Sequence, residues 1–109
     1  MTDKIPDSNE PIPKWDVALE ALARDEYQKK GVALRIDDFA RLAKDHAIRF
    51  DDIMVTLFEL VLQGEWRYED DERTIKVFTR SEVNQLYVNG RLSDRDVRHY
   101  TGYWSPIRR

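Results

Sequence analysis

Apolar side chains recur at steps of three and four along the first half of the chain, which is the period of helices that bury one face. A first helix is predicted over 13–30, with Pro13 in its first turn and Gly31 just past its end. Asp37 is the predicted N-cap of a second helix, which ends near position 46. Asp51 is the predicted cap of a third helix, which ends near position 64.

The pattern changes to alternation after the third helix. Trp66 and Tyr68 alternate with charged residues, and the segment 74–78 is rich in β-forming residues, so a β-hairpin is predicted over 66–78. A short apolar stretch at 32–34 predicts a brief strand between the first two helices. The expected fold class is therefore α+β and mostly helical.

Two more helices are predicted near the C-terminus, where capping-box patterns begin at Thr79 and Ser93. Gly90 is expected to close the first of them, and the second is expected to carry Val97, Tyr100 and Trp104 on its inner face. The complete prediction is three helices and a β-hairpin, followed by two additional C-terminal helices.

The length of 109 residues allows one domain, expected over 13–104. Residues 1–12 are polar and contain two prolines, which predicts a disordered tail, and 105–109 form a short basic tail. The chain has no cysteine and no apolar run long enough for a membrane span or a signal peptide. A cytoplasmic protein without membrane contact is expected.

The order helix, short strand, helix, tight turn, helix, hairpin resembles the winged helix-turn-helix domain over residues 34–79. The segment 36–43 resembles the second helix of that domain, 51–64 its third helix, and 66–78 its wing. The resemblance implies a third helix that enters the major groove of DNA.

The charges of this third helix argue against DNA reading. Helical spacing places Asp52, Thr56, Glu59 and Gln63 on its solvent side, so that the exposed stripe contains two acids and no base. Acidic residues also occupy the tip of the presumed wing, and the predicted acidic face consists of Asp52, Glu59, Glu69, Asp70, Asp71 and Glu72. Since DNA affinity comes largely from cations that neutralise phosphates, contact with nucleic acid through this face is disfavoured.

The third helix is apolar around nearly its whole circumference, which one small domain rarely buries completely. Either the C-terminal helices fold back over it, or part of it forms a contact surface. We expect both, with a second copy or another protein as the partner. The predicted interface residues are Met54, Val55, Leu62, Tyr103 and Trp104.

Charge is distributed unevenly along the chain. Residues 1–72 contain eighteen acids and ten bases, whereas 73–109 contain three acids and eight bases. The two halves can pair within the monomer, steer a charged partner or associate head to tail. The C-terminal arginines and aromatics can likewise bind nucleic acid, form a protein interface, or pin the last helix while the arginines stay solvated; these arginines are Arg91, Arg95, Arg98, Arg108 and Arg109.

Catalytic and metal-binding patterns are weak. His46 and His99 have no recognised metal spacing, and the carboxylate pairs 37–38 and 51–52 fit helix starts. No enzymatic activity, cofactor or metal is predicted. The expected function is a small non-enzymatic protein-interaction or accessory module, with a DNA-binding transcriptional regulator that uses the C-terminal arginines as the alternative. A third idea is an acidic surface that mimics DNA.

Overall fold

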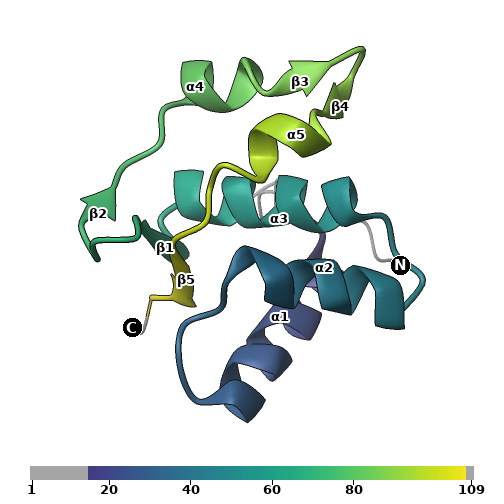
Figure 1. Cartoon of the computed structure of the whole chain (residues 1–109), viewed down its shortest axis with the longest axis vertical. Helices are drawn as coiled ribbons and strands as arrows, with labels where there is room; N and C mark the ends of the chain where they lie inside the picture. Colours follow the sequence, from purple (N-terminus) through teal and green to yellow (C-terminus); the bar gives the residue numbers. More distant parts are fainter. Residues whose placement is uncertain (1–14, 108–109) are drawn as a thin grey trace, which may run out of the picture.

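The computed structural model describes residues 15–107, which form an α+β arrangement around one hydrophobic cluster. The first half is helical and consists of α1 (Val17–Lys30), α2 (Ile36–Asp45) and α3 (Phe50–Leu62). In Figure 1, α1 and α2 lie on one side of α3, and both contact it. The three helices predicted from the apolar period are present, although they begin at other residues than predicted.

Asp16 sets the start of α1. Its carboxylate accepts hydrogen bonds from two N–H groups of the first turn, at 2.9 and 3.1 Å. The helix therefore begins at Val17 rather than near position 13, and Pro13 lies outside the described residues. Gly31 ends the helix as predicted, in the left-handed region at φ 81°, with its N–H bonded to the carbonyl of Tyr27.

The acids at the starts of α2 and α3 lie inside the first turn and not at the cap. The predicted caps at Asp37 and Asp51 are wrong, because Arg35 and Arg49 occupy those positions. The Asp38 carboxylate accepts the N–H of Arg35 at 2.8 Å. Unpaired N–H groups and the positive end of the helix dipole favour anions throughout the first turn, so an acid there does not mark the cap itself.

The sheet has three antiparallel strands. The hairpin predicted over 66–78 is confirmed as β1 (Trp66–Glu69) and β2 (Ile75–Lys76). β5 (Tyr103–Pro106) pairs with the other side of β1, so the strand order is β2-β1-β5. Leu34 adds a single bridge to Trp104, with two backbone hydrogen bonds of 2.8 Å.

β5 corrects two predictions. Trp104 lies in a strand and not in the last helix, and residues 105 and 106, predicted to belong to a tail, are part of the sheet. Aromatic residues favour strands when a neighbouring strand offers a packing partner. Tyr68 is that partner here, because it lies opposite Trp104 in the register and its ring centroid is 4.7 Å away.

Residues 79–100 form a separate layer, which we call the C-terminal cap. It contains α4 (Arg80–Asn84), β3 (Tyr87–Val88), β4 (Arg91–Leu92) and α5 (Asp94–Val97). The side chains of Thr79 and Ser93 accept N–H groups at the starts of α4 and α5, so both predicted helix starts are confirmed. Both helices are short, with five and four residues.

A second hairpin replaces the rest of the helix that was predicted to end at Gly90. β3 and β4 pair around Asn89 and Gly90, which have φ values of 54° and 81°. Two consecutive residues with positive φ define a turn that joins twisted strands well, and Asn-Gly is its preferred sequence. α4 therefore ends at Asn84.

α3 is the central element. Figure 1 shows it between α1 and α2 on one side and the C-terminal cap on the other, and β4 and α5 both contact it. Its Phe58 ring lies 5.3 Å from Trp104, 5.2 Å from Phe78 and 5.1 Å from Tyr100, which links the helices, the sheet and the cap in one aromatic cluster. Among residues 15–107, no helix has both the length and the apolar character needed to cross a bilayer.

Candidate functional site

The predicted acidic stripe on α3 is mostly hidden. Thr56 is buried, and Glu59 is only 8% exposed and forms an ion pair with Arg80 of the C-terminal cap. Asp52 is exposed. The prediction of a solvent-facing acidic edge along α3 is therefore wrong for Thr56 and Glu59. Arg80 of the C-terminal cap covers Glu59, and Thr56 is buried on the side of α3 where Trp15 and Leu19 lie.

The predicted interface is also corrected. Met54 and Trp104 are both 0% exposed and belong to the core, so they do not line a surface. Val55, Leu62 and Tyr103 are half-buried and retain some accessible surface. Of the two explanations for the apolar circumference of α3, fold-back of the C-terminal segment is observed, because β4 and α5 contact α3 on the side away from α1 and α2.

The C-terminal arginines have different environments. Arg91 forms an ion pair with Asp51 at 2.6 Å, and Arg98 pairs with Asp94 at 2.9 Å while its guanidinium lies 4.6 Å from the Phe50 ring centroid. Arg95 is exposed and has no partner among residues 15–107. The last two predicted residues, Arg108 and Arg109, lie outside the described residues.

The two unequally charged halves of the sequence pair with each other in the fold. Four cations from the second half contact acids from the first: Arg73–Glu69, Lys76–Asp70, Arg80–Glu59 and Arg91–Asp51. Of the alternatives for the charge asymmetry, pairing within one molecule is the one that the fold contains.

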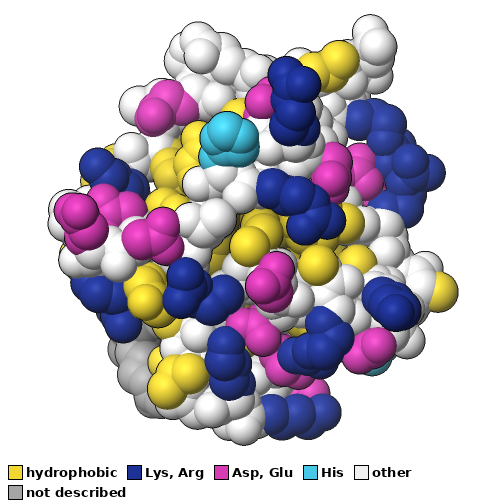
Figure 2. Space-filling model, in the orientation of Figure 1, with side chains coloured by type: hydrophobic (Ala, Val, Ile, Leu, Met, Phe, Trp, Pro, Cys, Tyr) yellow, Lys and Arg dark blue, Asp and Glu magenta, His cyan; other side chains and the backbone are white. Residues whose placement is uncertain are grey.

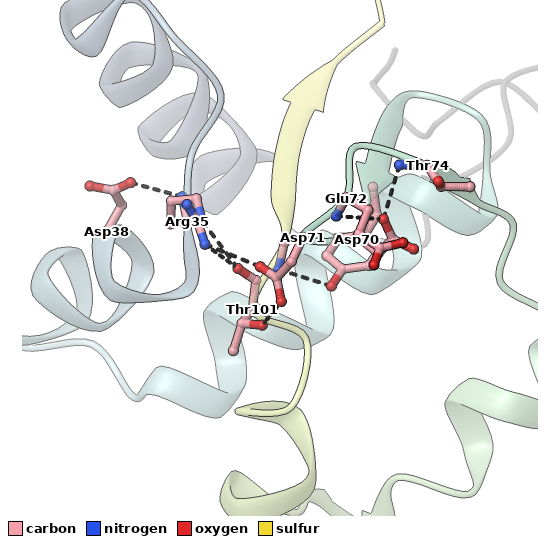
Figure 3. A network of polar contacts seen from close by, with 9 residues as sticks. Arg35, Asp38, Asp70, Asp71, Glu72, Thr74 and Thr101 are labelled. Atoms are coloured by element: carbon pink, nitrogen blue, oxygen red, sulfur yellow. Dashed lines mark hydrogen bonds and ion pairs between the residues drawn. The ribbon is translucent and has the colours of Figure 1, made fainter.

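The acidic turn between β1 and β2 is held by its own side chains (Figure 3). Asp70 accepts the N–H groups of Glu72 and Thr74, both at 2.9 Å. The hydrogen bond from Thr74 is the largest effect that lowers the pKa of Asp70. Asp71 accepts the hydroxyl of Thr101 at 2.6 Å, which ties the turn to the segment that leads into β5.

Arg35 links this turn to the start of α2 (Figure 3). Its Nε and Nη2 donate to the carbonyl of Thr101 at 3.0 and 2.8 Å, and Nη2 also lies 3.2 Å from Asp71. The guanidinium lies 4.3 Å from the ring centroid of Tyr103, and that of Arg73 lies 4.0 Å from the same ring. The β1–β2 turn is thus fixed to the start of α2 through Arg35 and to the segment before β5 through Thr101.

Alternation along the strands separates a core face from a solvent face. Trp66, Tyr68 and Trp104 are buried on the core face. Their neighbours along the strands point the other way: Arg67, Glu69, Ile75, Tyr103 and Ser105. Val77 follows β2 and continues the alternation, since it is exposed between Lys76 and the buried Phe78. We call these six residues the outer sheet face.

The outer sheet face carries the most exposed large apolar side chain of the described residues. Val77 is 82% exposed and Ile75 is 55% exposed. A hollow of about 370 Å³ opens at the Tyr103 end, lined by Val32 and by cationic side chains. Figure 2 shows acidic side chains at the left, over the β1–β2 turn, with Lys and Arg beside them.

Sequence reasoning identified Tyr103 but not Ile75 or Val77. The signal was present, because β-branched residues alternate with a lysine in the segment 74–78 and one of the two sides of an edge strand must face solvent. The same alternation that predicts the hairpin therefore also predicts its exposed side.

Titratable residues outside this face offer little for chemistry. His46 and His99 are both exposed, and the carboxylate pairs 37–38 and 51–52 lie in the first turns of α2 and α3, as predicted. Within residues 15–107, no group of three histidine or carboxylate side chains is placed to hold a metal ion.

Comparison with family models, curated proteins and solved structures yields no match to this chain.

Proposed function

We propose that this chain is a small, non-enzymatic protein-interaction or accessory module with a winged-helix-like fold, and that it contacts its partner through the outer sheet face. The order α1, Leu34 bridge, α2, α3 and β1–β2 hairpin supports the winged-helix assignment. β5 is an addition to that plan, because it lies between Leu34 and β1.

One observation carries the proposal: the outer sheet face exposes Ile75 and Val77 beside a tyrosine and arginines. Exposed apolar groups that lie together mark contact sites more often than single ones do. Tyrosine and arginine are enriched where protein interfaces bind most strongly, since both bring large contact area and polar groups.

The position of α3 supports a protein partner over DNA. A recognition helix must present one side to the major groove. α3 has α1 and α2 on one side and the C-terminal cap on the other, and ion pairs from Arg80 and Arg91 hold the cap in place. DNA contact through α3 would require the cap to leave.

The alternative of a DNA-binding regulator has weaker support. Arg91 and Arg98 already have carboxylate partners, which leaves Arg95 as the free one among the described C-terminal arginines. DNA mimicry is also weakly supported, because Glu59, Glu69 and Asp70 are engaged with cations of the same chain.

A paired substitution tests the proposal. The double variant Ile75→Lys/Val77→Lys removes the apolar part of the outer sheet face. Val88→Lys is the control, since Val88 is a valine on β3 that is as exposed as Ile75. In extracts of the cells that make the protein, the native chain and the control should elute from gel filtration in a larger protein complex. The double variant should elute near its own mass of 13.0 kDa.

Thermal unfolding of both variants serves as the check that they remain folded. Identical elution of the native chain, the control and a folded double variant would contradict the proposal.

A further inference from the structure

The sheet ends in an open edge at β2. Within residues 15–107, β2 has β1 on one side and no strand on the other. In an antiparallel pair, alternate residues direct their N–H and C=O groups away from the partner strand. One of the two residues of β2 therefore presents backbone groups that another strand can bind.

We propose that this edge adds an extended strand from another protein, in which acidic residues alternate with apolar ones. The inference rests on the proposed function and names the partner of the same surface. Strand addition takes its affinity from main-chain hydrogen bonds and its specificity from alternate side chains.

The edge is held ready for such a partner. Asp70 closes the turn before β2 through two backbone N–H groups, and Arg73, at φ 65°, is bonded through Nε to Glu69 at 2.7 Å. After β2, Phe78 is buried against Phe58. A strand fixed at both ends loses little conformational freedom on binding, which favours affinity.

Side chains along the edge define what the partner carries. Ile75 and Val77 project on the outer sheet face, and apolar residues of an added strand would pack beside them. Lys76 projects on the opposite side, and its side chain is 55% exposed. Its existing pair with Asp70 is long, at 3.8 Å, and leaves the ammonium free to bind a second carboxylate.

The charge on β2 favours acids in the partner. From Arg73 to Ser81 the sequence contains three cations and no acid. Arg73 and Arg80 are bound to Glu69 and Glu59, and Lys76, on β2 itself, has only the long pair with Asp70. An acidic residue placed opposite Lys76 would form a cross-strand pair of opposite charge, whereas a lysine there would be repelled.

A second copy fits this edge less well. If two β2 strands paired with Ile75 opposite Val77, each Lys76 would lie directly opposite the other Lys76. An acidic strand from a different protein avoids that repulsion, and the second copy becomes an outcome of the test.

The test uses the full chain and three synthetic peptides. The first is acetylated Thr-Val-Glu-Val-Glu-Val-Thr amide, the second has lysine in place of both glutamates, and the third is the first peptide with alternate backbone amides N-methylated. Isotope-labelled protein reports where each peptide binds through its amide resonances, and titration gives the affinity.

The acidic peptide should bind at β2 and at least about tenfold more tightly than the lysine peptide. The N-methylated peptide should lose this binding, because it keeps the side chains but not the backbone donors. In the variant Lys76→Glu, the preference should reverse toward the lysine peptide.

Equal affinities, absence of binding, or resonance changes away from β2 would overturn the inference. Self-association through β2 without peptide would overturn it in favour of a second copy. If the gel-filtration shift depends on Ile75 and Val77 while the peptides do not discriminate, the proposed function stands and only the strand-addition inference fails.

Discussion

Glu59 in the middle of α3 accepts hydrogen bonds from both terminal guanidinium nitrogens of Arg80, one of them at 2.9 Å. This hydrogen bonding raises the pKa of Arg80 above its ordinary value. The pair joins the C-terminal cap to a helix that would otherwise expose a carboxylate. This ion pair therefore helps to explain why the segment that begins at Thr79 folds over α3.

Arg80→Ala should lower the free energy of unfolding by about 1–2 kcal/mol, because it leaves the nearly buried Glu59 carboxylate without its cation. The double variant Glu59→Met/Arg80→Met should recover most of that loss, since a paired apolar contact removes the stranded charge. Denaturant unfolding measures both. An unchanged midpoint for Arg80→Ala would show that the pair does not hold the cap.

Arg91→Ala and Arg95→Ala separate a structural role from nucleic-acid binding. Arg91 contacts Asp51 at 2.6 Å, whereas Arg95 has no partner among the described residues. We expect Arg91→Ala to lower stability by about 0.5–1 kcal/mol and Arg95→Ala to leave it unchanged. When labelled DNA duplex is titrated at low salt, we expect no salt-sensitive binding by the native chain or by either variant. Steep, salt-dependent binding lost in both variants would instead favour the DNA-binding alternative.

Gly102 tests the close approach of β5 to the β1–β2 turn. A Cβ at this position would lie 1.9 Å from the carbonyl oxygen of Glu69, and backbone cannot yield as a flexible side chain does. Gly102→Ala should cost about 3 kcal/mol of unfolding free energy. Gly31→Ala is the control, because a Cβ there has no atom within 4 Å and only the positive φ disfavours the substitution. It should cost about 1 kcal/mol of unfolding free energy. Equal losses would mean that the contact relaxes freely.

Asp38 should make stability depend on pH in the acid range. Burial raises its pKa, but hydrogen bonds from Lys30 and from the N–H of Arg35, with the charges of Lys30 and Arg41, lower the pKa below its ordinary value of 3.8. Because the folded state holds the proton less tightly, the stabilisation is complete above pH 3.8 and is lost as pH falls through the lower folded-state pKa.

Asp38→Asn should therefore lower unfolding free energy by about 1 kcal/mol at pH 7, and the difference from the native chain should shrink toward zero in strong acid. Asp37→Asn is the matched control, because Asp37 is exposed and its side chain has no hydrogen bond or ion pair among the described residues. Chemical unfolding at several pH values makes the comparison. A deficit for Asp38→Asn that persists unchanged in strong acid would contradict this assignment.

Local signals in the sequence predicted much of the fold. The apolar period located α1 to α3, Gly31 ended α1, and the side chains of Thr79 and Ser93 began α4 and α5. These features depend on hydrogen bonds between residues a few positions apart, which a sequence displays directly. The β3–β4 hairpin is equally local, since Asn89 and Gly90 carry its turn signal, but the capping pattern at Thr79 predicts a helix that continues to Gly90.

Features that depend on distant residues were not predictable. β5 forms because Trp104 packs against Tyr68, 36 positions earlier in the chain, and because Leu34 pairs with Trp104 from its other side. The burial of Glu59 likewise depends on Arg80, which belongs to another layer. A helical stripe in a sequence shows which residues share a side, but packing decides whether that side meets solvent. For this reason the sequence predicted an interface on α3, whereas the exposed apolar residues Ile75 and Val77 lie on the outer sheet face.

The most direct measurement is photo-crosslinking in the cells that make this protein, with a photoreactive phenylalanine derivative placed at Val77 in one variant and at Val88 in another. Both sites are exposed, but only Val77 lies on the outer sheet face. A protein partner crosslinked at position 77 and not at position 88, with no crosslink to nucleic acid, is the predicted result. Crosslinking to DNA at position 77, or protein crosslinks equally strong at both positions, would contradict contact through the outer sheet face.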